Sequence, residues 1–176
     1  DVLLNGVSAE KAIVKTRYAD VLPSNKSLFG AGIQMTELEN REYILKNALA
    51  AVKDRYDYIF IDCSPSLGFT TVNILTAADS VLVPVQCEYF ALGGICKVLN
   101  TIKIIKSKLN PSLGIEGFLL TMYDSRLRLS NQVYDEVRRH FQELVFNTVI
   151  QRNVKLSEAP SHGLPAILYD ADSNGA

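Results

Sequence analysis

The sequence contains no tryptophan, only two histidines and only three cysteines among its 176 residues. Cys63, Cys87 and Cys96 form no C-x-x-C pair, so their spacing predicts neither a disulfide framework nor a zinc site. An excess of either charge is also missing, because 18 Lys and Arg face 19 Asp and Glu. Attraction of the whole molecule to nucleic acid or membrane is therefore not indicated, and any such binding must come from a local patch.

Long hydrophobic runs are absent as well. The longest apolar stretches are far shorter than the roughly 20 residues that a membrane helix needs, and no basic, apolar-cored leader is recognisable at the start. We therefore expect a cytoplasmic protein without membrane attachment. The length, with 48% hydrophobic and 21% charged residues, is typical of one globular domain, and we expect residues 1–176 to form a single domain.

Short apolar runs alternate with amphipathic segments along most of the chain. Strands are expected at residues 58–61, 80–85, 115–122 and 144–150, and helices at 41–55, 70–78, 91–109 and after Ser130 as an N-cap. Residues 2–14 look helical, and residues 18–23 look like a strand. Continuous apolar strands are typical of parallel sheets buried on both faces. The order predicts an α/β fold with a doubly wound, mainly parallel sheet and flanking helices, and the Gly93-Gly94 pair suggests a close backbone approach.

The strongest local signal is the run Tyr58-Ile59-Phe60-Ile61-Asp62. A carboxylate at the carboxyl end of a buried strand lies where open α/β sheets bind ligands. Four hydrophobic residues followed by Asp is the Walker B pattern, whose Asp helps to hold Mg²⁺ on a nucleotide. The alternative is an Asp that simply caps the next turn. The following Cys63–Gly68 segment (CSPSLG) could shape a loop of exposed backbone N–H groups near a phosphate, or it could be an ordinary turn.

A phosphate cradle of the form G-x-x-x-x-G-K-[ST] should precede such an Asp. None of the ten glycines is followed by lysine. Either Asp62 is not a nucleotide residue, or the sequence begins after the cradle.

The two histidines give little support to other chemistry. His140 follows Arg138-Arg139 and is expected on the surface, and His162 lies in a polar loop near Glu158. An acyl-transfer site at His162 is not favoured, because no G-x-S-x-G nucleophile motif accompanies it.

A basic patch lies between residues 126 and 155. Six cations stand against Asp135, Glu136 and Glu143, namely Arg126, Arg128, Arg138, Arg139, Arg152 and Lys155. Cations in exposed loops could contact DNA phosphates without reading the sequence. The alternative is a solvated face.

Three long segments resemble the ParA/Soj chromosome and plasmid partitioning ATPases. They are YDYIFIDCSPSLGFTTVNILTAADSVLVPVQCEYFALGGI, GFLLTMYDSRLRLSNQVYDEV and NTVIQRNVKLSEAPSHGLP, in this order. The resemblance runs over the whole chain, and three ordered motifs are more specific than any one. These proteins are deviant Walker A ATPases related to MinD, and their fold is similar to that of other P-loop NTPases.

The resemblance implies a function and a set of site residues. It implies an ATP-dependent homodimer that binds DNA non-specifically at the nucleoid, hydrolyses ATP with Mg²⁺ and is regulated by a ParB/Spo0J-like partner. It assigns Asp62 to Mg²⁺ through water and places Ser64 and Pro65 in the switch loop. The remaining assignments are Met122, Gln151, Arg152 and Asn153 at the adenine pocket, and Arg126 and Lys155 at DNA.

The chain departs from the family pattern at three places. The K-G-G-V-G-K-T-T loop with its strand and the D-x-D-P-Q segment with the catalytic Asp do not occur in it, so we expect no catalytic residue and little ATPase activity in this chain alone. The closing helix of the family does not follow Gly175-Ala176. Gln151 stands where proline is usual, and Ser64 replaces the first of two prolines.

Three other functions remain open at this point. A MinD-like cell-division-site ATPase would need a basic amphipathic C-terminal helix, whereas the SEAPSHG and DSR segments favour partitioning. A non-enzymatic DNA-binding or dimerisation module is the second alternative. The third is a regulator of the cell cycle or of replication initiation, which some family members are.

Overall fold

The computed structural model describes residues 1–63 and 68–176. The chain divides into two compact units, and each is described by itself. The first comprises residues 1–79 and 101–113, and the second, here called the sheet unit, comprises residues 80–100 and 114–176.

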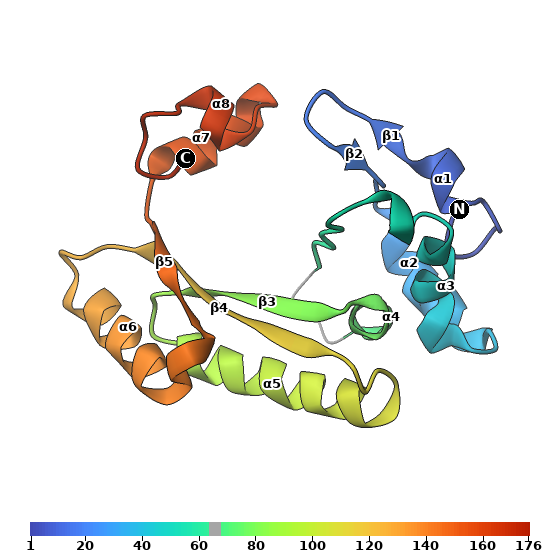
Figure 1. Cartoon of the computed structure of the whole chain (residues 1–176), viewed down its shortest axis with the longest axis horizontal. Coiled ribbons are helices and arrows are strands. Elements are labelled where there is room, and N and C mark those ends of the chain that lie inside the picture. Colours follow the sequence, from blue (N-terminus) through green and yellow to red (C-terminus); the bar gives the residue numbers. More distant parts are fainter. Residues whose placement is uncertain (64–67) are drawn as a thin grey trace. The chain divides into compact units, whose positions relative to one another are not determined.

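A parallel three-stranded sheet is the centre of the sheet unit (Figure 1). Its strands are β3 (Ser80–Gln86), β4 (Gly114–Tyr123) and β5 (Val145–Gln151), in the order β3-β4-β5. The predicted strands at 80–85, 115–122 and 144–150 are thus confirmed within one or two residues. With helices flanking the sheet, the predicted α/β class with parallel pairing is confirmed as well.

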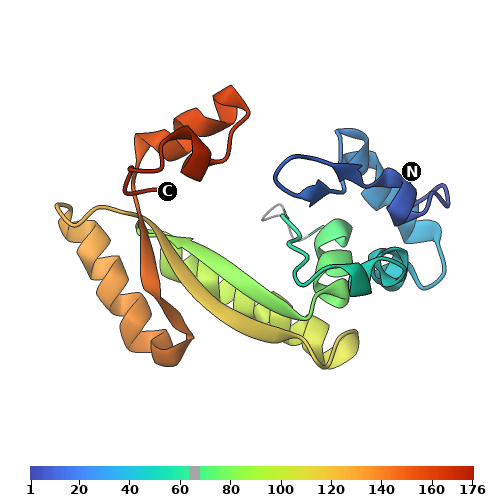
Figure 2. The ribbon, with the colours of Figure 1, turned by 45° about the horizontal axis from the view of Figure 1, so that its top comes forward.

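One face of this sheet carries the core. The part of α5 (Ala91–Lys108) that belongs to this unit, residues 91–100, and α6 (Arg128–Phe141) lie along the strands (Figures 1 and 2). Ile95 of α5 and Val137 of α6 join Phe118 and Leu120 of β4 in one buried cluster. Burial alternates along β3, so the prediction that this strand is buried on both faces is wrong. Pro84 fits there because β3 is an edge strand of the described sheet, and an edge strand tolerates a missing backbone N–H.

The sheet unit ends in short helical segments after β5. They are α7 (Val154–Glu158), η5 (Ala159–His162) and α8 (Ala166–Tyr169). Gly163 closes η5 in the left-handed conformation at φ 65°, and its backbone N–H donates to the Pro160 carbonyl. Left-handed backbone suits glycine, which has no Cβ.

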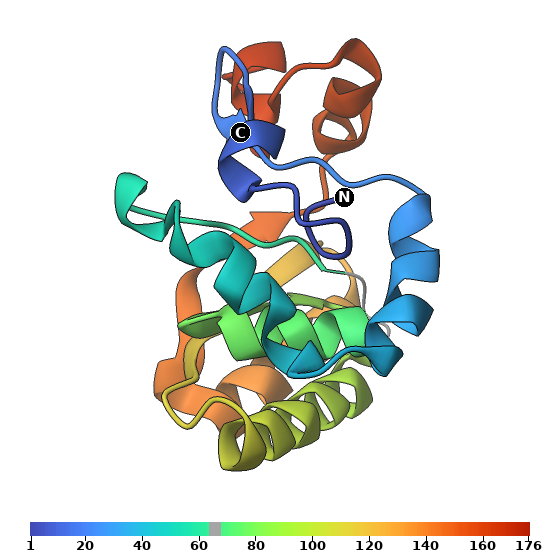
Figure 3. The ribbon, with the colours of Figure 1, turned by 90° about the vertical axis from the view of Figure 1, so that its right-hand side faces the viewer.

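The first unit is mainly helical (Figure 3). Its elements are α1 (Ala9–Ala12), β1 (Val14–Lys15), β2 (Asp20–Val21), α2 (Ser27–Gln34), η1 (Met35–Glu37), η2 (Arg41–Tyr43), α3 (Ile44–Ala50), η3 (Lys53–Arg55) and α4 (Phe69–Ala77). The helix predicted at 41–55 is thus divided into three pieces. The helix predicted at 2–14 shrinks to one turn, and β1 pairs with β2 in an antiparallel hairpin.

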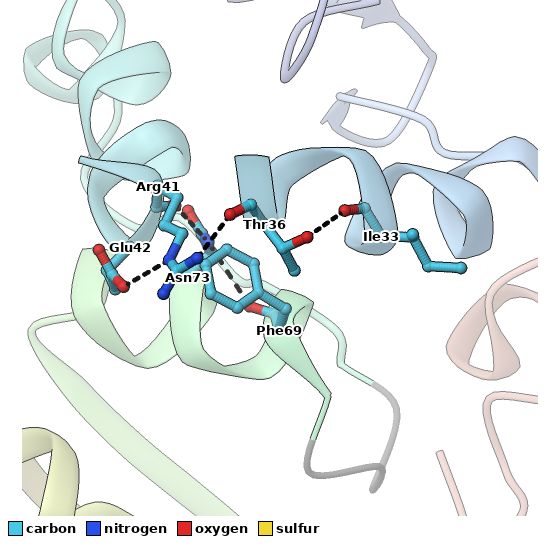
Figure 4. Close-up of polar contacts among 6 residues, drawn as sticks. All are labelled: Ile33, Thr36, Arg41, Glu42, Phe69 and Asn73. Atoms are coloured by element: carbon cyan, nitrogen blue, oxygen red, sulfur yellow. Dashed lines mark hydrogen bonds and ion pairs between the residues drawn. The ribbon is translucent and has the colours of Figure 1, made fainter. Parts of the chain in front are cut away.

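Asn73 ties α4 to the segments before it (Figure 4). Its buried amide donates to the Arg41 carbonyl at 2.9 Å and accepts from the Leu45 backbone N–H at 3.1 Å. The Arg41 guanidinium in turn lies 5.6 Å from the centre of the Phe69 ring and donates to the Thr36 carbonyl. The hydrogen bonds of Asn73 therefore hold the middle of α4 and satisfy an amide that would otherwise be buried without a partner.

The strand predicted at Tyr58–Ile61 is not formed. These residues have no strand pairing, and the side chains of Tyr58 and Phe60 are 81% and 88% exposed. A strand requires a neighbour for its backbone N–H and C=O groups, and no strand in the described residues pairs with this run. The close approach predicted at Gly93-Gly94 is also wrong, because a Cβ added at either glycine would meet no described atom within 4 Å.

Candidate functional site

The carboxyl ends of the three parallel strands lie side by side in the sheet unit. Tyr123 at the end of β4 is the register partner of Gln151 at the end of β5. Backbone hydrogen bonds continue the pairing past the strand ends, since Cys87 donates to Thr121 at 3.0 Å and Arg152 donates to Tyr123 at 2.9 Å. Ligands of open α/β sheets bind outside this edge, so we call it the carboxyl edge and take it as the candidate site.

Met122 lies at the carboxyl edge in an unusual conformation. Its φ of 53° is in the left-handed region, which non-glycine residues rarely adopt. The register between β4 and β5 shifts between Leu120 and Tyr123, so this strand end is irregular. Such irregularities often redirect side chains next to a site, and Met122, the residue predicted for the adenine pocket, lies at this irregular strand end.

Asp124 follows β4 directly and holds Arg126. Its carboxylate accepts from the Arg126 backbone N–H at 3.0 Å, from Nε at 2.9 Å and from Nη2 at 2.8 Å. These hydrogen bonds lower the pKa of Asp124 to about 2. The Asp124 side chain is only 13% exposed, whereas that of Arg126 is 86% exposed. The carboxylate is thus the fixed partner, and the guanidinium is presented to solvent.

Ser130 has a different role from the one predicted. The N-cap of α6 is Leu127, so the prediction that Ser130 begins this helix is wrong. The buried Ser130 hydroxyl instead accepts from the Asp124 backbone N–H at 3.1 Å. It therefore helps to fix the turn that carries Asp124 and Arg126.

The residues after β5 are held by charge pairs and a cap. Arg152 pairs with Glu88 at 3.1 Å. The Asn153 side chain accepts from the Lys155 backbone N–H at 2.8 Å and so caps α7. Gln151 is exposed.

The predicted excess of cations is compensated by carboxylates that a local count missed. Lys155 pairs with Glu158 at 3.0 Å, so Arg126, Arg152 and Lys155 each have an acidic partner from outside residues 126–155. The partners are Asp124, Glu88 and Glu158. Asp124 has a sequence signal like that of Asp62, a carboxylate directly after an apolar strand. Glu88 has no comparable signal, because its pairing is with a residue distant in sequence.

The predicted Mg²⁺ residue Asp62 lies in the other unit and is exposed. An exposed carboxylate is the hard oxygen ligand that Mg²⁺ prefers, and Mg²⁺ usually takes few protein ligands beside phosphates and waters. In residues 1–63 and 68–176, no three His, Cys, Asp or Glu side chains gather to hold a metal. The exposed Asp62 carboxylate therefore fits the usual way in which Mg²⁺ is bound, through one or two protein carboxylates. Ser64 and Pro65 lie outside the described residues.

No helix in the described part of the chain is long and apolar enough to cross a membrane.

Comparison with known proteins identifies the family. The family model described as "AAA domain" matches residues 1–115. The sporulation initiation inhibitor protein Soj of Bacillus subtilis is 56% identical over 157 residues, which are 89% of this chain and 62% of Soj. The chromosome partitioning protein ParA of Caulobacter vibrioides is 46% identical, with 100% of this chain and 67% of ParA covered. The chain thus spans about two thirds of the length of these relatives.

Solved structures confirm the fold. Cobyrinic acid a,c-diamide synthase from Mycobacterium smegmatis, with bound ADP and magnesium, matches with a TM-score of 0.80 and 40% identity, over 97% of this chain and 66% of that one. Apo McdA from Cyanothece matches with a TM-score of 0.86 at 16% identity, over 97% and 70% of the two chains, which supports the P-loop NTPase-like fold alone. The family model and the relatives together show that the chain belongs to the ParA/Soj family of chromosome partitioning ATPases.

Proposed function

We propose that this chain is part of a DNA-segregation ATPase that dimerises with ATP, binds DNA non-specifically at the nucleoid and is regulated by a ParB-like partner. The observation that carries the proposal is the high identity to proteins named Soj and ParA. The carboxyl edge supports the proposal, because open α/β sheets bind ligands there. Arg126 follows β4, Arg152 follows β5, and Asn153 caps α7 just beyond β5.

The proposed residue roles rest on the resemblance of the sequence to the ParA/Soj family. Asp62 holds Mg²⁺ through water, and Ser64 and Pro65 belong to the switch loop. The adenine side is formed at the ends of β4 and β5 by Met122, Gln151, Arg152 and Asn153. ATP and Mg²⁺ supply the transferable phosphoryl group and its charge neutralisation, whereas the residues of this chain orient the nucleotide.

Arg126 and Lys155 are proposed to contact DNA phosphates. Replacing Arg126 with alanine is expected to weaken binding of the chain to a random-sequence duplex and to flatten the salt dependence by about 0.9 in log K against log salt, because one phosphate contact is lost. Gel shifts between low and moderate salt measure both quantities. Arg139→Ala is the matched control, since Arg139 is also an exposed, ion-paired arginine but lies near the end of α6. An affinity unchanged by Arg126→Ala would reject this contact.

The chain alone is proposed to be inactive as an ATPase. Phosphoryl transfer depends almost entirely on positioning and charge stabilisation by a phosphate-binding loop, its lysine and Mg²⁺, and no glycine of this sequence is followed by lysine. We expect phosphate release at the background rate when the purified 176-residue chain is incubated with ATP, Mg²⁺, DNA and a ParB-like protein. Robust turnover that is abolished by Asp62→Ala would contradict the proposal and would place a complete site in this chain.

A further inference from the structure

The short helices after β5 lie close together in the ribbon (Figure 1), and Lys155 belongs to the first of them, α7. We call Lys155, Glu158, His162 and Tyr169 the α7–α8 cluster. The Lys155 ammonium lies 3.0 Å from Glu158 Oε2 and 5.6 Å from the centre of the Tyr169 ring. The His162 ring stacks on the Tyr169 ring, with 4.8 Å between the two centres. The ammonium is thus folded back onto its own chain.

Two interactions oppose the release of this ammonium. The hydrogen bond from Lys155 to Glu158 and the charge of Glu158 raise the pKa of Lys155, with smaller contributions from Tyr169 and Asp170. A cation over an aromatic ring is also attracted by the negative face of the ring. Lys155 must leave both the carboxylate and the ring before it can extend toward a phosphate.

The Glu158 carboxylate that pairs with Lys155 is itself held in place. The Tyr169 hydroxyl donates to the same Oε2 atom at 3.1 Å, so the carboxylate is fixed from a second side. The hydrogen bonds from Lys155 and Tyr169 lower the pKa of Glu158, which keeps it charged at neutral pH. Exposed ion pairs are usually weak because two long side chains must be ordered. Here Tyr169 orders one of the two.

We propose that Glu158, positioned by Tyr169, competes with DNA phosphates for the Lys155 ammonium and thereby limits non-specific DNA binding. The proposal rests on the proposed function, because it assumes that Lys155 contacts DNA. A phosphate that binds Lys155 must displace Glu158 and leaves this carboxylate unpaired beside the negatively charged duplex. Removing the carboxylate charge therefore removes both the competition and the repulsion.

The test is the affinity of Glu158→Gln for a fluorescein-labelled random-sequence duplex, measured by anisotropy over a series of NaCl concentrations. Glutamine can still accept from Tyr169 but no longer neutralises Lys155. We expect binding about twofold to fivefold tighter than that of the unchanged chain, the range set by the strength of one surface ion pair. The slope of log K against log salt is expected to become steeper by up to about 0.9. Tyr169→Phe, which keeps both charges, is expected to give a smaller increase in affinity.

The matched control is Glu136→Gln. Glu136 also forms an i,i+3 ion pair with an exposed cation, Arg139, at 2.8 Å. This variant makes the same change in net charge, and we expect it to leave the affinity nearly unchanged. An increase as large as that of Glu158→Gln would show a general charge effect and overturn the inference.

The double variant Lys155→Ala/Glu158→Gln separates the inference from the proposed function. Without Lys155, Glu158→Gln can relieve only the repulsion between the carboxylate and the duplex, so it is expected to add less affinity than in the unchanged chain, and an undiminished gain would overturn the inference. If Lys155→Ala weakens binding while Glu158→Gln leaves it unchanged, the DNA contact stands and the competition is rejected. If Arg126→Ala, Lys155→Ala and Glu158→Gln all leave the affinity unchanged, the DNA contact itself is rejected and the inference falls with it.

Discussion

Replacing Phe118 with alanine is expected to lower the free energy of unfolding of the sheet unit by about 3–5 kcal/mol. Phe118 is fully buried in the central strand β4, at 0% exposure, and its ring centre lies 4.6 Å from that of Phe141 of α6. The loss combines the transfer energy of the ring with a cavity between the sheet and its helix, which a central strand cannot close by moving.

Urea unfolding followed by far-UV circular dichroism measures this change. Phe90→Ala is the matched control, because the Phe90 side chain is 83% exposed and its removal is expected to change stability by less than about 0.5 kcal/mol. A loss at Phe118 no larger than that at Phe90 would mean that β4 is not the centre of the core.

Gly117→Ala is expected to cost about 2–4 kcal/mol, although it adds a single methyl group. Gly117 has a φ of 152°, and its added Cβ would lie 2.7 Å from the Leu144 carbonyl oxygen and 2.8 Å from the Phe146 ring. The backbone oxygen cannot turn away as a flexible side chain can. Because Gly117 directly precedes buried Phe118, β4 cannot shift to relieve the overlap without disturbing the core.

Gly94→Ala adds the same methyl group at a position where there is room for it. Gly94 lies in α5, with no described atom within 4 Å of an added Cβ, and alanine there is expected to stabilise the chain by up to about 1 kcal/mol. Melting temperatures of the two variants should therefore move in opposite directions. A Gly117→Ala variant as stable as the unchanged chain would show that the approach of Leu144 is not fixed.

The sequence predicts the sheet unit well because its signals are local. Apolar runs such as residues 115–122 end at turn residues, and amphipathic spacing marks α5 and α6, so the strand and helix bounds follow closely. The failures come from partners that are distant or missing. Tyr58–Ile61 has the composition of a buried strand, but strand formation depends on a neighbour rather than on composition.

In the candidate site too, features set by the local sequence are predicted, whereas features set by distant residues are not. The positions of Met122 and Gln151 at strand ends, and of Lys155 in the segment after β5, follow from the alternation of strands and helices. The ion pairs near the site do not follow from the local sequence, because Arg152 pairs with Glu88, which is 64 positions away in the sequence. A count of charges within residues 126–155 gives an excess of cations. In the folded chain, Arg126, Arg152 and Lys155 each form an ion pair with a carboxylate outside that range. The affinity for a polyanion therefore depends on pairings that only the structure shows.

The exposed run Tyr58–Phe60 has a practical consequence for work with the isolated chain. An exposed apolar segment that pairs with no strand of the described residues can act as a template on which segments of other chains add as strands. Self-association through this run would grow with concentration and would compete with the intended measurements. Solubility, more than folding of the sheet unit, then sets the upper concentration at which the chain behaves as separate molecules.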